Sequence, residues 1–250
     1  TWNIQGRGEA AVLAAPYAIA TSGTAGTLRT AQQLAEDAIT NTGWTIDWQI
    51  IDWTLPASSL TWSDKTPIEL VLMIAAAAGG VVQADPSQKI LHVLSRYPVS
   101  SWDLSGATPQ VSLPQNVIKS LSSDWQLGQP YNRVFVAGEH AGITLQLTRD
   151  GSLGDKPAPM IVDRLLTDYQ ANRERGRVEL SKSGKHSRES IDLPLATPPD
   201  EPALITPGSI VQVNDGVAIW RGICRSVQVE AVSSDVATVN QRISVERYFE

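Results

Sequence analysis

Two segments in the first hundred residues carry the apolar spacing of α-helices. The first has an apolar stripe made of Leu28, Ala31, Leu34, Ala35 and Ala38. Thr27 or Thr30 can cap this helix, because a threonine hydroxyl accepts hydrogen bonds from the free amides of a first turn. Gly43 is placed to end it. The pattern therefore predicts an amphipathic helix packed against a core.

The second helical segment, residues 67–78, is apolar on nearly every side, which predicts a buried helix. A cap is available between Ser63 and Thr66, Pro67 suits the first turn, and Gly79-Gly80 ends the segment. Each helix leads into strand-like sequence, at residues 44–53 after the first and at 81–85 and 89–94 after the second. Residues 1–97 are thus expected to form a small α/β module with two helices.

The pattern changes after a stretch rich in Ser, Pro and Gly, residues 98–114, which is expected to be a linker. One amphipathic helix is expected around residues 159–175. Alternating strand patterns occupy most of the remainder, at residues 117–125, 132–138, 142–149, 177–180, 189–195, 204–213, 216–224, 225–232 and 237–248. The expected fold class is α+β, with the α/β module followed by a mainly antiparallel β-barrel domain, residues 115–250, that carries one inserted helix.

Composition limits the classes of protein further. The chain has 250 residues, 42% of them hydrophobic and 18% charged, so a packed core is expected. The net charge of -6 disfavours tight wrapping around a nucleic-acid backbone. Cys224 stands alone, which excludes an internal disulfide or a cysteine metal cage and favours a buried thiol. The longest apolar run, Leu70–Val82, is shorter than the ~20 residues of a membrane helix, and no membrane insertion is expected.

Two glycine motifs resemble nucleotide-binding loops only loosely. Gly6-Arg7-Gly8-Glu9-Ala10-Ala11 fits a dinucleotide fingerprint, but Pro16 would stop the following helix within two turns. A tight turn is the favoured interpretation. Lys182-Ser183-Gly184-Lys185-His186-Ser187 lacks the first glycine of a phosphate loop, since Glu179 stands there. A hairpin tip is favoured.

No catalytic, cofactor-binding or metal-binding residue is predicted. His92, His140 and His186 have no metal-ligand spacing and none lies near Cys224. A Gly-x-Ser-x-Gly nucleophile elbow is missing, although a serine, a histidine and a carboxylate could still converge in space. We therefore expect a protein that is not an enzyme and needs no cofactor.

A carbohydrate-binding or carbohydrate-degrading module is the alternative. Its carboxylate pair would come from Asp47, Asp52, Asp64 and Glu69, and its sugar-stacking surface from Trp44, Trp48 and Trp53. Aromatic side chains at strand spacing more often pack in a core, which is the favoured interpretation. Quenching of these tryptophans by soluble glycans would separate the two. A mixed-charge cluster of Arg173, Glu174, Arg175 and Arg177 suits a helix C-terminus, and is only a weak candidate for a DNA contact.

Several of these patterns together resemble the central hub proteins of phage tail tips and baseplates. They are the Gly6–Gly8 turn before a short helix, the helix that runs into Gly43-Trp44, and the Thr66–Gly80 segment. The second half is similar to the closing barrel of that family in the segments Leu204–Val213, Trp220–Ile223 and Ile243–Arg247. The resemblance covers nearly the whole chain. Hub proteins also carry an earlier tube-like β domain, of which only the last strand is expected here, at Thr1–Gln5.

This resemblance implies a ring of three copies at the tip of the tail tube, in the virion, after synthesis in the host cytoplasm. The implied partners are the tail tube or distal tail protein on one side and a spike or fibre protein on the other. Genome DNA would pass through the ring during ejection without specific binding. An acidic lumen would keep that path non-adhesive, so the charged residues facing the axis are expected to be mainly Asp and Glu.

Overall fold

The computed structural model describes residues 6–139, 142–196, 202–232 and 238–249. The expected strand Thr1–Gln5 and the histidine His140 lie outside the described residues. The chain forms two compact units, each from two stretches of sequence. Unit 1 comprises Thr1–Arg96 and Asn132–Leu180, and unit 2 comprises Tyr97–Tyr131 and Ser181–Glu250.

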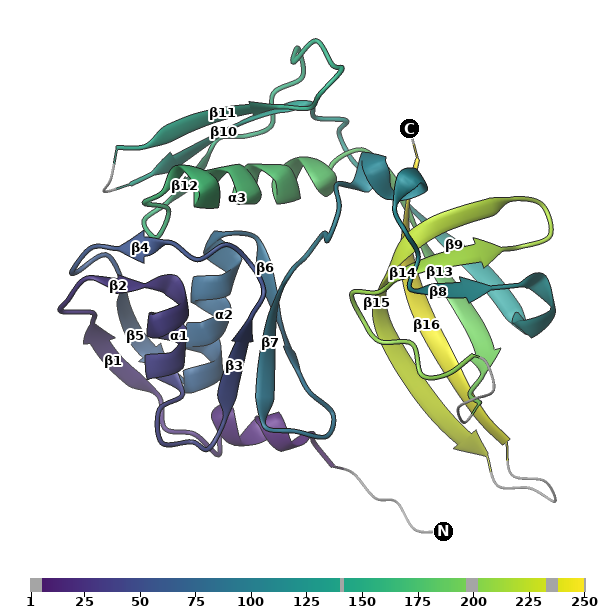
Figure 1. Ribbon diagram of the computed structural model, residues 1–250, viewed down its shortest axis with the longest axis horizontal. Helices are drawn as coiled ribbons and strands as arrows, with labels where there is room; N and C mark the ends of the chain where they lie inside the picture. The colour runs from purple at the N-terminus through teal and green to yellow at the C-terminus, as the bar shows by residue number, and fades with distance from the viewer. Residues whose placement is uncertain (1–5, 140–141, 197–201, 233–237, 250) are drawn as a thin grey trace. The chain divides into compact units, whose positions relative to one another are not determined.

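The first stretch of unit 1 contains the two expected helices, α1 (Ala31–Ala38) and α2 (Pro67–Ala77) (Figure 1). After them, Gly43 and Gly79 adopt positive φ angles of 78° and 76°. Strands β3 (Thr45–Trp48) and β6 (Gly80–Ala84) follow directly, and β7 (Ile90–Ser95) lies between them, parallel to β3 and antiparallel to β6. The glycine stop of α2 is confirmed, whereas α1 ends at Ala38, five residues before Gly43. Residues 1–97 contain the expected helices and strands, but they form a compact unit only together with Asn132–Leu180. Smaller elements complete this part: η1 (Glu9–Leu13), β1 (Thr21–Thr24), β2 (Arg29–Thr30), β4 (Thr54–Leu55) and β5 (Thr61–Lys65).

The start of α2 depends on Thr66 and Glu69. The amide and the hydroxyl of Thr66 both donate to Glu69 Oε2, at 2.8 and 2.9 Å. Thr66→Ala removes the hydroxyl and is expected to lower the free energy of unfolding by about 1 kcal/mol. Thr66→Ser keeps the hydroxyl, so its free energy of unfolding should fall much less. Urea denaturation of the two variants measures the difference. An equal loss in both would show that the methyl group matters more than the cap.

The second stretch of unit 1 contains the helix that the sequence placed at 159–175. The helix is α3 (Tyr169–Ser181), and it begins there because Asp168 Oδ1 accepts from the amides of Gln170 and Ala171. The helix continues through Gly176, where a Cβ would lie only 3.1–3.3 Å from side-chain atoms of Val134, Val136 and Leu147, so a larger residue would fit only if these side chains shifted. The strand expected at 177–180 is therefore wrong. A small sheet underlies the helix, made of β10 (Arg133–Gly138), β11 (Thr144–Thr148) and β12 (Ile161–Asp163).

Unit 2 is a six-stranded sheet in the order β8-β14-β15-β16-β13-β9. Residues 98–114, expected as a linker, hold the 3-10 helix η2 (Ser101–Gly106) and strand β8. The sequence predicts separate strands at 216–224 and 225–232, but one unbroken strand, β15, runs from Ile219 to Val232 and the turn before it lies at 215–218. The remaining bounds are β8 (Val111–Leu113), η3 (Gln115–Val117), β9 (Ser120–Leu127), β13 (Lys185–Pro194), β14 (Ile210–Asn214), β15 (Ile219–Val232) and β16 (Thr238–Phe249).

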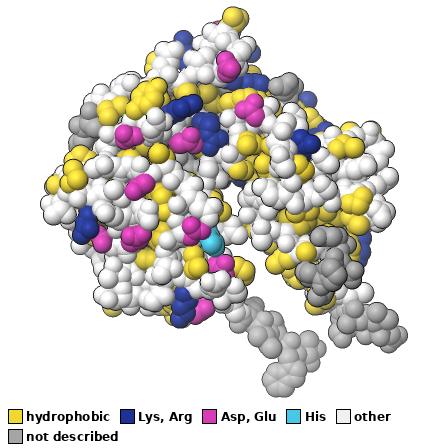
Figure 2. Space-filling model, in the orientation of Figure 1, with side chains coloured by type: hydrophobic (Ala, Val, Ile, Leu, Met, Phe, Trp, Pro, Cys, Tyr) yellow, Lys and Arg dark blue, Asp and Glu magenta, His cyan; other side chains and the backbone are white. Residues whose placement is uncertain are grey.

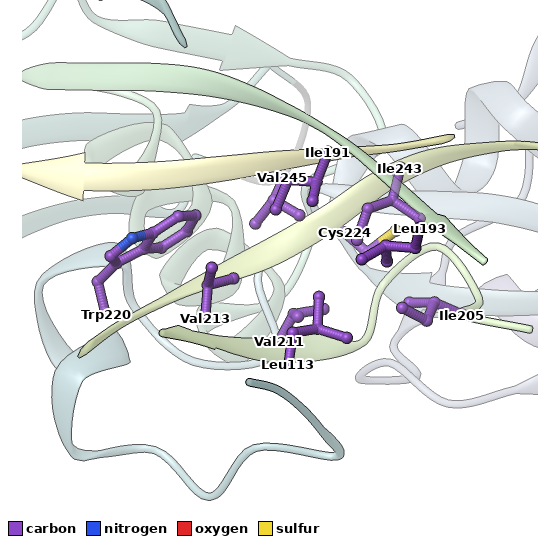
Figure 3. Packing of buried hydrophobic residues seen from close by; sticks show 10 residues of the cluster. All are labelled: Leu113, Ile191, Leu193, Ile205, Val211, Val213, Trp220, Cys224, Ile243 and Val245. Atoms are coloured by element: carbon purple, nitrogen blue, oxygen red, sulfur yellow. The ribbon is translucent and has the colours of Figure 1, made fainter. Parts of the chain in front are cut away.

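The expected barrel is not confirmed. Within the described part of the chain, β8 and β9 form the two edges of the sheet and do not pair with each other. The long strands β13, β15 and β16 form its centre (Figure 1). One face of the sheet carries a buried cluster with Trp220 at one end (Figure 3), completed by Leu113, Ile191, Leu193, Ile205, Val211, Val213, Cys224, Ile243 and Val245. A mixed α+β architecture is what the structure shows.

No helix in the described ranges is both long and apolar enough to cross a lipid bilayer.

Candidate functional site

The tryptophans of the carbohydrate alternative lie mostly inside unit 1. Trp44 and Trp53 are buried, with 5% and 3% of their surface exposed. The indole Nε1 of Trp53 donates to the carbonyl of Leu165 at 2.7 Å, and that of Trp48 donates to the carbonyl of Ile51. The rings of Trp48 and Trp53 lie 6.4 Å apart. These contacts support the core interpretation and leave no stacking surface at Trp44 or Trp53.

Three of the four carboxylates proposed for that alternative have separate structural partners, and the backbone amide of the fourth residue, Asp64, donates to the hydroxyl of Ser22. Asp52 Oδ1 accepts from the amide of Gln32 in the first turn of α1, at 3.0 Å. Asp47 instead bonds the side chains of Gln49 and His92. Glu69 caps α2, as described above. On the visible face of unit 1, acidic side chains are spread among neutral and hydrophobic ones (Figure 2). We find no catalytic carboxylate pair in these residues.

His92 lies between two aspartates on unit 1. Its Nδ1 is 2.8 Å from Asp47 Oδ2, and its Nε2 is 3.3 Å from Asp85 Oδ2. The hydrogen bond with Asp47 is the main reason that the pKa of His92 is raised. The amide and hydroxyl of Ser87 lower the pKa of Asp85 to about 2. The cluster ties β3 and β7 to the 85–88 turn, and among the described residues no three His, Cys, Asp or Glu side chains gather as a metal site.

The remaining motifs also have structural roles. Gly8 precedes η1, a 3-10 helix of 5 residues that is too short to form a dinucleotide site. The hairpin tip expected at residues 182–187 is wrong, because residues 182–184 join the end of α3 to β13. The backbone of Gly184 bonds that of Gly128 and Gln129. Arg177 is paired with Glu174 and Ser95, and Arg175 donates to the carbonyl of Ala76, so both side chains have partners within the chain. Burial raises the pKa of the Cys224 thiol to about 11, which confirms the expectation of a buried thiol.

A buried ionic network occupies the interior of unit 2. The carboxylate of Glu246 accepts from the hydroxyl of Tyr97 at 2.6 Å and from Nε of Arg225 at 2.6 Å. Its Oε1 also lies 3.0 Å from Nδ1 of His186. The side chain of Glu246 is 16% exposed and that of His186 only 6%. Although burial raises the pKa of Glu246, its partners outweigh that effect and hold the pKa at about 2, so the group is a carboxylate that ties β16 to β13, β15 and Tyr97.

A series of stacked cationic and aromatic side chains crosses the same sheet, and we call it the stacked ladder. The Lys185 ammonium lies 4.9 Å from the ring centroid of Trp125, and the rings of Trp125 and Phe249 are 4.6 Å apart. The guanidinium of Arg247 lies 4.6 Å from the ring centroids of both Phe249 and Trp220. Four strands therefore contribute to it: β9, β13, β15 and β16.

A pocket of about 420 Å³ opens beside the stacked ladder in unit 2. Arg221 is fixed in its wall, since Nε donates to Gln212 Oε1 and Nη1 donates to the carbonyl of Ser105. Ser101 is also in the wall and is 2% exposed. The aromatic part of the lining consists of Trp102, Trp220, Tyr248 and Phe249. Two arginines and, among the residues that the structure describes, no carboxylate line this pocket, which makes it the best candidate for a binding site.

The sequence did not reveal this pocket, because its residues come from η2, β14, β15 and β16. The only local signal is the alternation of Arg247 and Phe249 at the end of the last strand. That alternation places both side chains on one face. It does not tell which distant strand supplies Trp220 or Trp125.

Comparisons with known proteins show that the fold of this chain also occurs in solved structures. No family model matches the chain, and no curated protein matches it. Among solved structures, the tail protein from Neisseria meningitidis MC58 is similar, with a TM-score of 0.63 and 13% identity, over 97% of this chain and 73% of that one. The 43 kDa tail protein of prophage MuSo2 from Shewanella oneidensis is similar with a TM-score of 0.61 and 18% identity, over 97% and 73%. The chain thus shares its fold, along nearly its whole length, with two tail proteins, one of them from a prophage.

Proposed function

We propose that this chain is a structural, non-enzymatic component of a phage tail. The observation that carries the proposal is the likeness of its fold to two tail proteins over 97% of the chain. More finely, we propose a hub at the tail tip or baseplate, formed by a ring of three copies. It would join the tail tube to the spike or fibre proteins, and DNA would pass through it during ejection.

The edge strand β9 supports assembly into a ring. All eight of its residues are exposed, and it pairs only with β13 among the described strands. An exposed edge presents unpaired amides and carbonyls to any second strand, and soluble proteins usually cover or charge such an edge. Trp125 and Leu127 of β9 are 51% and 78% exposed. If a different surface of a neighbouring copy covers this strand, such as the other sheet edge β8, the contact is head-to-tail and can close into a ring under cyclic symmetry.

Sedimentation of the purified chain tests the ring. The expected mass is that of three 27.0 kDa chains, with a three-fold ring in electron-microscope class averages. Leu127→Lys places a second cation beside Lys185, its partner in the sheet, and should shift the chain towards the monomer. The matched control is Leu153→Lys, at a position 93% exposed in unit 1, which should leave the mass unchanged. A chain that stays monomeric at high concentration, or that forms dimers, would contradict the ring.

A further inference from the structure

Arg247, in the wall of the pocket of unit 2, has no anionic partner among the residues that the structure describes. Glu189 and Asp215 act on it only at longer range, and their own hydrogen bonds go elsewhere. Glu189 accepts from the hydroxyls of Ser123 and Ser187, and Asp215 accepts from the indole of Trp220. Burial is the main reason that the pKa of Arg247 is lowered, so the cation is partly removed from water. A partly desolvated cation of this kind is stabilised by an incoming anion.

The contacts that Arg247 does make leave its hydrogen-bond donors available. The rings of Trp220 and Phe249 touch the guanidinium by stacking. The N–H groups of a guanidinium lie in its plane and form a fork that matches the two oxygens of a carboxylate. The rings also restrict the side chain, so less freedom is lost when a ligand binds.

A second group in the wall lacks a partner. The hydroxyl of Ser101 is buried and makes no hydrogen bond within the described structure, although the residue lines the pocket. A buried hydroxyl without a partner is unfavourable, and an oxygen or nitrogen of a ligand would satisfy it. The pocket therefore combines an unpaired cation, an unsatisfied hydroxyl and apolar rings.

We propose that this pocket is a carboxylate-binding site, and that its occupant is an Asp or Glu side chain of a partner polypeptide. Arg247 is the bidentate donor, and Ser101 is the additional polar contact. An acidic sugar would need an open aromatic face for stacking. Trp220 is only 7% exposed, and the ring of Phe249 is already in contact with Arg247 and Trp125, so of the four aromatic lining residues only Trp102 and Tyr248 would be left for stacking. The choice of a polypeptide as the occupant rests on the proposed role in tail assembly. The proposal that the pocket binds a carboxylate does not depend on that role.

The test is a titration of the full chain, followed by the indole N–H signals of its tryptophans in NMR spectra. The probes are N-acetylglutamate N-methylamide, its glutamine counterpart and glucuronate. The Trp220 signal is assigned with Trp220→Phe. Titrations are repeated with Leu127→Lys, so that contacts between copies do not hide the pocket. The matched substitutions are Arg247→Lys, and Arg242→Lys on the same strand, where Asp192 already pairs with the arginine.

The glutamate probe is expected to shift the Trp220 signal saturably, and the glutamine probe should bind at least about tenfold more weakly. Arg247→Lys should weaken the glutamate probe by a similar factor, while Arg242→Lys should leave it unchanged. Equal binding of the glutamate and glutamine probes would overturn the carboxylate site. The absence of any shift of the Trp220 signal, both in the native chain and in Leu127→Lys, would overturn it as well. Much tighter binding of glucuronate would overturn the polypeptide occupant. A monomeric chain that binds the glutamate probe would contradict the ring alone, and a ring that fails to bind it would contradict the pocket alone.

Discussion

Replacing Glu246 with alanine is expected to destabilise the protein by about 3–5 kcal/mol, because it removes the carboxylate at the centre of a buried network. Arg225 would lose its partner at 2.6 Å, and the hydroxyl of Tyr97, a residue 1% exposed, would lose its acceptor. The side chain of Arg225 is only 20% exposed, and a partly buried cation without a counter-charge is far less favourable than the intact pair. Urea denaturation followed by circular dichroism measures the loss.

The matched control is Asp192→Ala, which breaks another carboxylate–arginine pair between β13 and β16. That pair is solvated, since the side chain of its Arg242 is 57% exposed. Exposed pairs contribute little to stability, so the control should lose far less than Glu246→Ala. Similar losses in both variants would contradict the assignment of a buried network to Glu246.

The same network predicts how stability depends on pH. The pKa of Glu246 falls from an ordinary 4.5 to about 2 in the folded protein. A lowered carboxyl pKa stabilises the fold fully above the unfolded value, and this contribution is lost as the pH falls from 4.5 towards about 2. Between neutral pH and about pH 3, the free energy of unfolding should therefore fall more steeply for the native chain than for Glu246→Ala. Parallel curves would contradict the lowered pKa.

The second large effect is expected at Gly79, where α2 passes into β6. A Cβ on this residue would lie 2.8 Å from both Cβ and Cγ2 of Val178 on α3. Rotation of Val178 cannot relieve the contact with its own Cβ, so the backbone of α3 would have to move. The positive φ of 76° adds strain for any residue with a side chain. Gly79→Ala should therefore cost about 2–5 kcal/mol, the sum of overpacking and backbone strain.

Gly43→Ala separates the two causes. Gly43 has nearly the same φ, 78°, but nothing lies within 4 Å of the position that a Cβ would take there. Only the backbone strain remains, and it should cost about 1–2 kcal/mol. Adding Val178→Ala to Gly79→Ala should recover part of the steric loss, because it vacates the space of the two methyl groups. Equal losses at the two glycines would contradict the close packing of α2–β6 against α3.

The parts of the fold that were predicted correctly are those that depend on residues close to one another in the sequence. Thr30 caps α1 and Thr66 caps α2, and a glycine follows each helix within a few residues. Capping and positive φ are decided by neighbouring residues, so a single sequence reveals them. The core position of Trp44 could be inferred for a similar reason, from its spacing with Ile46 and Trp48 on one strand face.

The errors come from contacts that are distant in sequence. Residues 161–163 fit a helical pattern, but they pair in parallel with β10 and form a strand. Gly176 resembles a helix stop, but it is needed where α3 packs on β10 and β11. The pocket was missed for the same reason, since Arg247 meets Trp220 only when β15 pairs with β16. None of these three long-range contacts has a local signal in the sequence.

The division into two interleaved units also determines when each part can fold during synthesis. Unit 1 lacks α3 until the ribosome has passed Leu180, and the sheet of unit 2 lacks its central strands until β16 emerges. Strand β9 leaves the ribosome early but pairs with β13, which begins at Lys185. At ~5–20 residues per second, it waits roughly 3–12 s for that partner. During this interval both of its edges are open, so chains growing side by side on one message could pair through β9 before either has folded.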